Sequence, residues 1–119
     1  MIRTLMISAT LALSFGGAAL AAPDLTPAFK GTIVSTYPSG RSTKLWLNPD
    51  GTYTAQRTHG GRTSGVWKFK GDRVCLTQKQ PASFPFSFCN AIPAVGAGQT
   101  WQSKSPKGEP LNNRLEPTR

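Results

Sequence analysis

The sequence predicts an all-β protein, an antiparallel up-and-down meander of about eight short strands that closes into a small barrel. Between short polar turns, apolar and polar residues alternate as in half-buried strands, and no helical period follows the N-terminal segment. Four turns end in glycine, at Pro38-Ser39-Gly40, Pro49-Asp50-Gly51, His59-Gly60-Gly61 and Pro106-Lys107-Gly108. A type I turn closed by a left-handed glycine is a common hairpin loop, so each turn predicts a hairpin and fixes its register.

The first 21 residues have the pattern of a secretory signal peptide. Arg3 supplies an early positive charge, Leu5–Phe15 is largely apolar, and Ala19-Leu20-Ala21 is a small-x-small cleavage site. The alternative, an uncleaved signal anchor, is weakened by the glycines and alanines after the apolar stretch. We therefore expect a signal peptide at 1–21, a single β-barrel domain at 22–119, a periplasmic or secreted location, and no integral membrane segment after cleavage.

The first three loops set the register of the first four strands. The first loop places Ile33 opposite Leu45. The second places Leu47 opposite Tyr53, and the third places Tyr53 opposite Trp67. These strands are expected at 29–37, 41–48, 52–58 and 62–70.

Four further strands complete the predicted meander. A two-residue turn at 71–72 begins this half of the chain. The loop that ends in the last turn glycine pairs Trp101 with Asn113, and 91–98, which holds proline and glycine, is the one irregular connection. The strands are expected at 73–79, 84–90, 99–105 and 109–116.

Cys75 and Cys89 are the only two cysteines of the chain. An exported protein meets an oxidising compartment, so we expect them to form a disulfide. If they are directly opposed, Leu76 faces Phe88 and both cysteines lie on the outer face of the sheet beside Lys68. A bridge closing a loop of this length contributes about 3 kcal/mol to stability in the chain-entropy model.

The predicted registers agree on one apolar face. With no helix to cover that face, the sheet must bury it by curling onto itself, which favours a barrel. A two-sheet β-sandwich is the alternative fold. The predicted inner face consists of Ile33, Leu45, Leu47, Tyr53, Ala55, Trp67, Phe69, Val74, Leu76, Phe84, Phe86 and Phe88.

Three short motifs carry a resemblance to known proteins. Asp50-Gly51-Thr52-Tyr53-Thr54, then Gly65-Val66-Trp67, then Gly71-Asp72-Arg73-Val74-Cys75-Leu76 with Cys89 following, resemble a group of small, signal-bearing bacterial proteins. The Gly-Thr-Tyr and Gly-x-Trp rhythm is also similar to that of lipocalin-like or calycin barrels, whose members bind ligands in the barrel mouth. Neither resemblance implies a particular activity.

The expected mature chain is strongly basic. The protein has 14 Lys and Arg against 5 Asp and Glu, and removing Arg3 with the signal leaves 13 basic residues, a formal charge of +8. This charge favours anionic partners such as lipopolysaccharide, phospholipid headgroups or acidic polysaccharide. The basic residues are scattered singly and the protein is expected to be exported, so we expect no nucleic-acid partner. We also expect a monomer.

No catalytic, metal-binding or cofactor-binding constellation is evident in the sequence. The single histidine, His59, lies in a glycine-rich turn, where a solvated turn residue is the simplest interpretation. Asp50 and Asp72 occupy turn positions, and no hydroxyl–histidine–acid set or metal-ligand spacing can be assembled. We therefore expect a protein that is not an enzyme and that needs no cofactor.

Arg57 is the first candidate ligand-binding residue. The register directs it inward at the barrel end that carries the first and third loops, with Thr43 on the same face and Tyr37 and Arg41 at the lip. An arginine ringed by hydroxyl groups suits bidentate binding of a carboxylate or phosphate. In the alternative interpretation, Arg57 extends into solvent and caps the core.

Trp46 is the second candidate. The register places it on the outer face beside Lys44, next to Thr32 and Thr54. A tryptophan beside basic residues suits contact with a sugar, a lipid headgroup or a protein, unless 91–98 or the mature N-terminus covers it. The sequence thus predicts a non-catalytic binding module for an anionic small molecule or cell-envelope component. The alternative is a protein-interaction or inhibitor module acting through an exposed sheet face.

Overall fold

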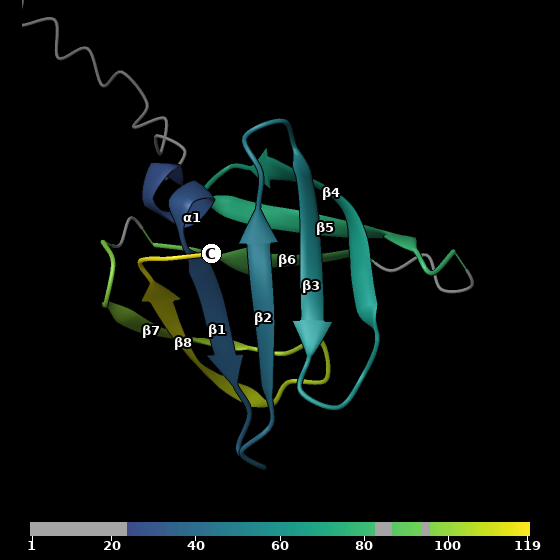
Figure 1. Cartoon of the computed structure of the whole chain (residues 1–119), viewed down its shortest axis with the longest axis vertical. Coiled ribbons are helices and arrows are strands. Elements are labelled where there is room, and N and C mark those ends of the chain that lie inside the picture. Colours follow the sequence, from purple (N-terminus) through teal and green to yellow (C-terminus); the bar gives the residue numbers. More distant parts are fainter. Residues whose placement is uncertain (1–23, 83–86, 94–95) are drawn as a thin grey trace, which may run out of the picture.

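The computed structural model describes residues 24–82, 87–93 and 96–119, and it shows the predicted antiparallel meander (Figure 1). The predicted signal peptide lies outside the described residues. The elements are α1 (Thr26–Lys30), β1 (Thr32–Thr36), β2 (Ser42–Leu47), β3 (Thr52–Arg57), β4 (Arg62–Lys70), β5 (Arg73–Gln80), β6 (Ser87–Ala91), β7 (Thr100–Lys104) and β8 (Pro110–Glu116). They form one sheet in the order β6-β5-β4-β3-β2-β1-β8-β7.

The sheet curls into a nearly closed barrel because β8 pairs with β1. Ile33 of β1 lies opposite Leu115 of β8. The remaining seam lies between β6 and β7, the two ends of the sheet order. At this seam Asn90 Nδ2 donates a hydrogen bond to the carbonyl oxygen of Lys104 at 3.3 Å. The predicted irregular connection joins these two edge strands.

Three of the four glycine-ended loops have the predicted conformation. Gly40, Gly51 and Gly108 are left-handed, with φ values of 87°, 87° and 84°. The cross-strand pairs that these loops and the opposed cysteines predicted are confirmed: Ile33 with Leu45, Leu47 with Tyr53, Leu76 with Phe88, and Trp101 with Asn113.

The predicted register of the third loop is wrong by two residues. Tyr53 lies opposite Gly65 rather than Trp67. The loop is wider than a three-residue turn because Thr58 bonds to β2: its amide donates to the carbonyl of Ser42 at 3.1 Å, and its Oγ1 accepts from the Ser42 amide at 2.9 Å. A shift of two residues keeps every side chain on its predicted face, so the predicted inner face is unchanged by this error.

A short helix, α1, contradicts the prediction of no helix after the signal and replaces the start of the predicted strand 29–37. Asp24 accepts hydrogen bonds from the hydroxyl and the amide of Thr26, which together lower the pKa of its carboxyl. Ala28 is buried, and the Phe29 ring lies 5.7 Å from that of Trp67 between centroids. Five residues are too few to show a helical period, so only the packing reveals this helix.

The core gathers inner-face side chains from most of the sheet. Phe69 was predicted to be inside but is 36% exposed. The last hydrogen bond between β4 and the segment of β3 is the one that the Trp67 amide donates to the carbonyl of Gly51, so Phe69 lies beyond the cover of β3. Phe84 and Phe86 lie outside the described residues. The buried core consists of Leu25, Ala28, Ile33, Leu47, Tyr53, Val74 and Leu115, with Leu45, Ala55, Trp67, Leu76 and Trp101 among the partly buried residues packed against it.

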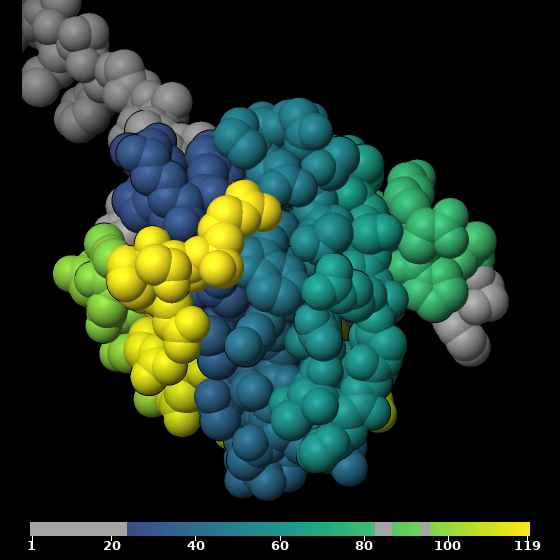
Figure 2. Space-filling model, in the orientation of Figure 1, coloured from purple at the N-terminus to yellow at the C-terminus, as the bar shows by residue number. Residues whose placement is uncertain are grey.

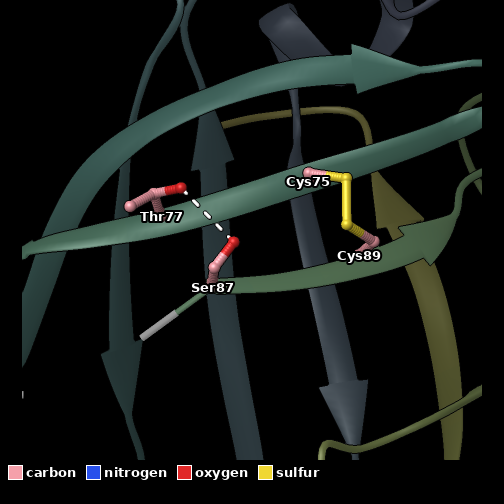
Figure 3. Close-up of a disulfide and its surroundings, with 4 residues drawn as sticks. All are labelled: Cys75, Thr77, Ser87 and Cys89. Carbon is pink, nitrogen blue, oxygen red and sulfur yellow. Dashed lines mark hydrogen bonds between the residues drawn. A yellow bond between two sulfur atoms is a disulfide. The ribbon is translucent and has the colours of Figure 1, made fainter. Parts of the chain in front are cut away.

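The predicted disulfide is present between β5 and β6 (Figure 3). Cys75 and Cys89 lie directly opposite each other, and Cys75 also lies opposite Lys68 of β4. Although it is on the outer face, Cys75 is only 3% exposed. The next pair along, Thr77 and Ser87, brings two hydroxyl groups within 3.5 Å.

Candidate functional site

The two ends of the barrel are built differently (Figure 1). We call one the helix end: it carries α1, the turns 48–51 and 71–72, and the C-terminal residues. There the Arg119 guanidinium connects the C-terminus to α1 and to the turn 48–51. It donates to the carbonyl of Phe29 at 2.8 Å and to Asn48 Oδ1 at 2.7 Å. We call the other the loop end: it carries the connections 37–41, 57–61 and 105–109.

Acidic residues concentrate at the helix end. Asp24, Asp50 and Asp72 lie before α1 and in the two turns, and Glu116 closes β8 beside them. Asp50 accepts hydrogen bonds from Thr52 through its hydroxyl at 2.6 Å and its amide at 3.0 Å, and both bonds lower the pKa of the carboxyl. Lys30, Lys70, Arg73 and Arg119 lie at the same end, and Arg114 forms an ion pair with Glu116, so five bases and four acids give the helix end a formal charge of +1.

Basic residues dominate the loop end. Arg41, Arg57, Arg62, Lys104 and Lys107 lie in its loops or at the strand ends beside them, and all five are exposed. The acid in these segments is Glu109, so five bases and one acid give the loop end a formal charge of +4. Within the described part of the chain, none of the five bases forms an ion pair. Their charge is available to a ligand.

The residues predicted at the barrel mouth lie together at the loop end. Arg57 is the last residue of β3 and lies opposite Thr43, as predicted. The Tyr37 amide donates to the carbonyl of Arg41 at 2.8 Å across the first loop. The Arg57 side chain is exposed and its stem lies beside Gly60, where an added Cβ would approach the Arg57 Cβ to 3.3 Å. Arg57 therefore presents its charge to solvent, as the alternative interpretation expected.

A buried polar cluster beneath the loop end was not predicted. Asn113 is 4% exposed, and its Oδ1 accepts from the Ser35 hydroxyl at 2.6 Å. Its Nδ2 donates to the carbonyl of Trp101 at 3.2 Å and to the Ser103 hydroxyl at 2.9 Å. The cluster ties β1, β8 and β7 together at the point where the sheet closes. The cluster could have been predicted from the pairing of Trp101 with Asn113, because this pairing places the Asn113 side chain on the inner face.

Replacing Asn113 with alanine is expected to destabilise the protein by about 1–3 kcal/mol, because the Ser35 and Ser103 hydroxyls lose their buried partner. The matched control is Asn112→Ala on the exposed face of the same strand, with an expected change within about 0.5 kcal/mol. Urea denaturation measures both. Equal destabilisation by the two variants would contradict a structural role for the cluster.

Trp46 is less accessible than the sequence suggested. It lies on the outer face and is half-buried, and its Nε1 donates to Thr32 Oγ1 at 2.8 Å. The same hydroxyl donates to the carbonyl of Thr118 at 2.8 Å. In Figure 2 the C-terminal residues, in yellow, lie across the barrel beside α1. The C-terminal segment thus lies next to Trp46.

The fold and the site together define a small antiparallel β-barrel with one disulfide between neighbouring strands and a positively charged loop end. Comparison of the chain with protein-family models, curated proteins and solved structures finds no match. Among the described residues, no helix has the length and apolar character needed to cross a membrane.

Proposed function

We propose that this protein is an exported, non-catalytic binding module that holds an anionic component of the cell envelope against its loop end. The observation that carries the proposal is the asymmetry of charge. The loop end has a formal charge of +4 with no ion pair among its described bases, whereas the formal charge of the helix end is +1. A field of this kind orients the barrel and attracts anions to one end.

The exposure of the bases favours an extended anionic surface over an enclosed small molecule. Arg41, Arg57 and Arg62 present guanidinium groups, which bind phosphate or carboxylate through paired hydrogen bonds. Lys104 and Lys107 add charge from the neighbouring hairpin. Because these side chains extend into solvent from three connections, several phosphate or carboxylate groups can engage them together.

The alternative, a protein-interaction or inhibitor module, receives less support from the structure. That function was expected to use a flat apolar patch around Trp46. The indole of Trp46 is half-buried and bonded to Thr32. Among the residues that the structure describes, the exposed large apolar side chains are Val66 and Phe69, and these two lie on opposite faces of β4.

The proposal is tested by two double variants that change the net charge equally. Arg41→Gln with Arg57→Gln removes two charges from the loop end, and Lys70→Gln with Arg73→Gln removes two from the helix end. Each charge near an anionic membrane contributes about 1 kcal/mol, so the first variant is expected to weaken co-sedimentation with phosphatidylglycerol vesicles about 30-fold. The second is expected to change it less than about threefold.

Two outcomes of this experiment would contradict the proposal. One is equal weakening by both variants, which would assign binding to net charge alone. The other is binding that persists unchanged between about 50 mM and about 500 mM NaCl, because salt at the higher concentration screens exposed charges strongly. Addition of inorganic phosphate at constant ionic strength distinguishes the sources of the anion: displacement from the vesicles would show that a small phosphate occupies the same groups.

A further inference from the structure

The outer wall of the barrel carries a groove away from the loop end. It lies over β1, β8 and β7 and has a volume of about 440 Å³. The strand register arranges its outward side chains in two neighbouring cross-strand rows. One row is Thr36, Asn112 and Gln102, and the other is Val34, Arg114 and Thr100. We infer that this groove binds a neutral saccharide.

The two rows together supply the hydrogen-bonding groups that sugar hydroxyls require. Asn112 and Gln102 each offer an amide donor and a carbonyl acceptor, and the hydroxyls of Thr36 and Thr100 both donate and accept. In the described part of the chain, none of these four side chains makes a hydrogen bond to another protein group. They are therefore free to pair with adjacent hydroxyls of a ligand.

The charge of the groove argues for a neutral ligand. Arg114 Nη2 lies 2.7 Å from Glu116 Oε1, so the guanidinium already has its counter-ion. An additional anion would meet the Glu116 carboxylate beside it, whereas a sugar hydroxyl can donate to the carboxylate and accept from the guanidinium. Val34, which lies opposite Arg114 and two residues before Thr36 on β1, provides an apolar contact for the C–H face of a sugar ring. The volume of the groove lies within the range of small-molecule sites.

Isothermal titration calorimetry with maltotriose, cellotriose and N,N′-diacetylchitobiose tests the inference. At least one of these neutral probes is expected to bind, with an affinity that changes less than about twofold between about 50 mM and about 500 mM NaCl. Gln102→Ala and Asn112→Ala are each expected to weaken that binding about tenfold. Gln56→Ala, which removes an amide from the outer face of β3, is the matched control and is expected to leave it unchanged. Both groove residues are exposed, so we expect their variants to melt at the same temperature as the unmodified protein, which would show that they fold.

The inference is overturned if none of the three probes binds, if the groove variants bind as the unmodified protein does, or if digalacturonate binds and the neutral probes do not. The site is independent of the proposed function, and the loop-end variant Arg41→Gln with Arg57→Gln separates the two. That variant is expected to retain saccharide binding in full, and loss of binding would place the saccharide at the loop end and contradict the groove. If the protein does not bind vesicles, the prediction of saccharide binding in the groove still stands. If no saccharide binds, the prediction of anion binding at the loop end still stands.

Discussion

Replacing Gly65 with alanine is expected to destabilise the protein by about 3 kcal/mol, because the added methyl group has no space. Gly65 is buried in β4 opposite Tyr53. A Cβ at this position would overlap the backbone carbonyl of Thr77 and lie 2.9 Å from Cε1 of the Tyr53 ring. Thr77 is fixed within β5 and Tyr53 is only 5% exposed, so neither can move without disrupting the sheet or the core.

Gly61→Ala is the matched control for this substitution. Gly61 is not left-handed, and a Cβ there would meet no atom within 4 Å. Its expected effect is within about 0.5 kcal/mol. Chemical denaturation of both variants measures the difference. If Gly65→Ala were as stable as Gly61→Ala, the observed register of β3 with β4, which places Gly65 against Tyr53, would be wrong.

Removing the disulfide is expected to have a similarly large effect. The double variant Cys75→Ser, Cys89→Ser is expected to lose about 3 kcal/mol, mainly because the unfolded chain regains the freedom of the closed loop. For a domain of this size the melting temperature falls on the order of 15 °C. Thermal denaturation, followed by circular dichroism with and without reductant, measures the loss.

Reductant provides an internal control for the disulfide prediction. The unmodified protein with reductant is expected to melt close to the double variant, and the variant itself is expected to be insensitive to reductant. Ser87→Ala, which removes an exposed hydroxyl on β6 beside the bridge, is expected to change stability by no more than about 0.5 kcal/mol. A double variant as stable as the oxidised protein would show that the bridge does not stabilise the fold.

The sequence predicted most of the architecture because its hairpins obey local rules. A glycine that must adopt positive φ marks the end of a tight loop, and Gly40, Gly51 and Gly108 do so. Once a loop is located, the alternation of side chains determines which residues face inward. The opposed cysteines then gave the register of β5 with β6 from a separate observation.

The errors arise where contacts between distant segments decide the structure. The third loop is widened because Thr58 bonds to Ser42 and so continues the pairing of β3 with β2, and Ser42 lies outside the loop. The helix α1 is held by packing of Leu25 and Ala28 on the core rather than by its own length. The exposure of Phe69 depends on where β3 begins, because Thr52, its first residue, lies opposite Val66 and leaves Phe69 beyond the pairing of the two strands.

The candidate site was predictable only in part for the same reason. The register placed four of the residues at one end of the barrel. Tyr37 and Arg41 flank the first loop, and Thr43 pairs with Arg57 beside the third loop. The contribution of Lys104 at the end of β7 and of Lys107 in the connection 105–109 depends on the pairing of β8 with β1. The groove on the outer wall also requires that pairing, because its rows cross β1, β8 and β7.

Mapping the binding surface with nuclear magnetic resonance shows directly whether the loop end binds anions. The ¹⁵N-labelled protein would be titrated with a short-chain, water-soluble phosphatidylglycerol. We expect the largest amide shifts to fall in 37–41, 57–62 and 104–109, and to decrease as salt is added. Shifts centred on α1 and the turns 48–51 and 71–72, or no shifts at all, would contradict this expectation.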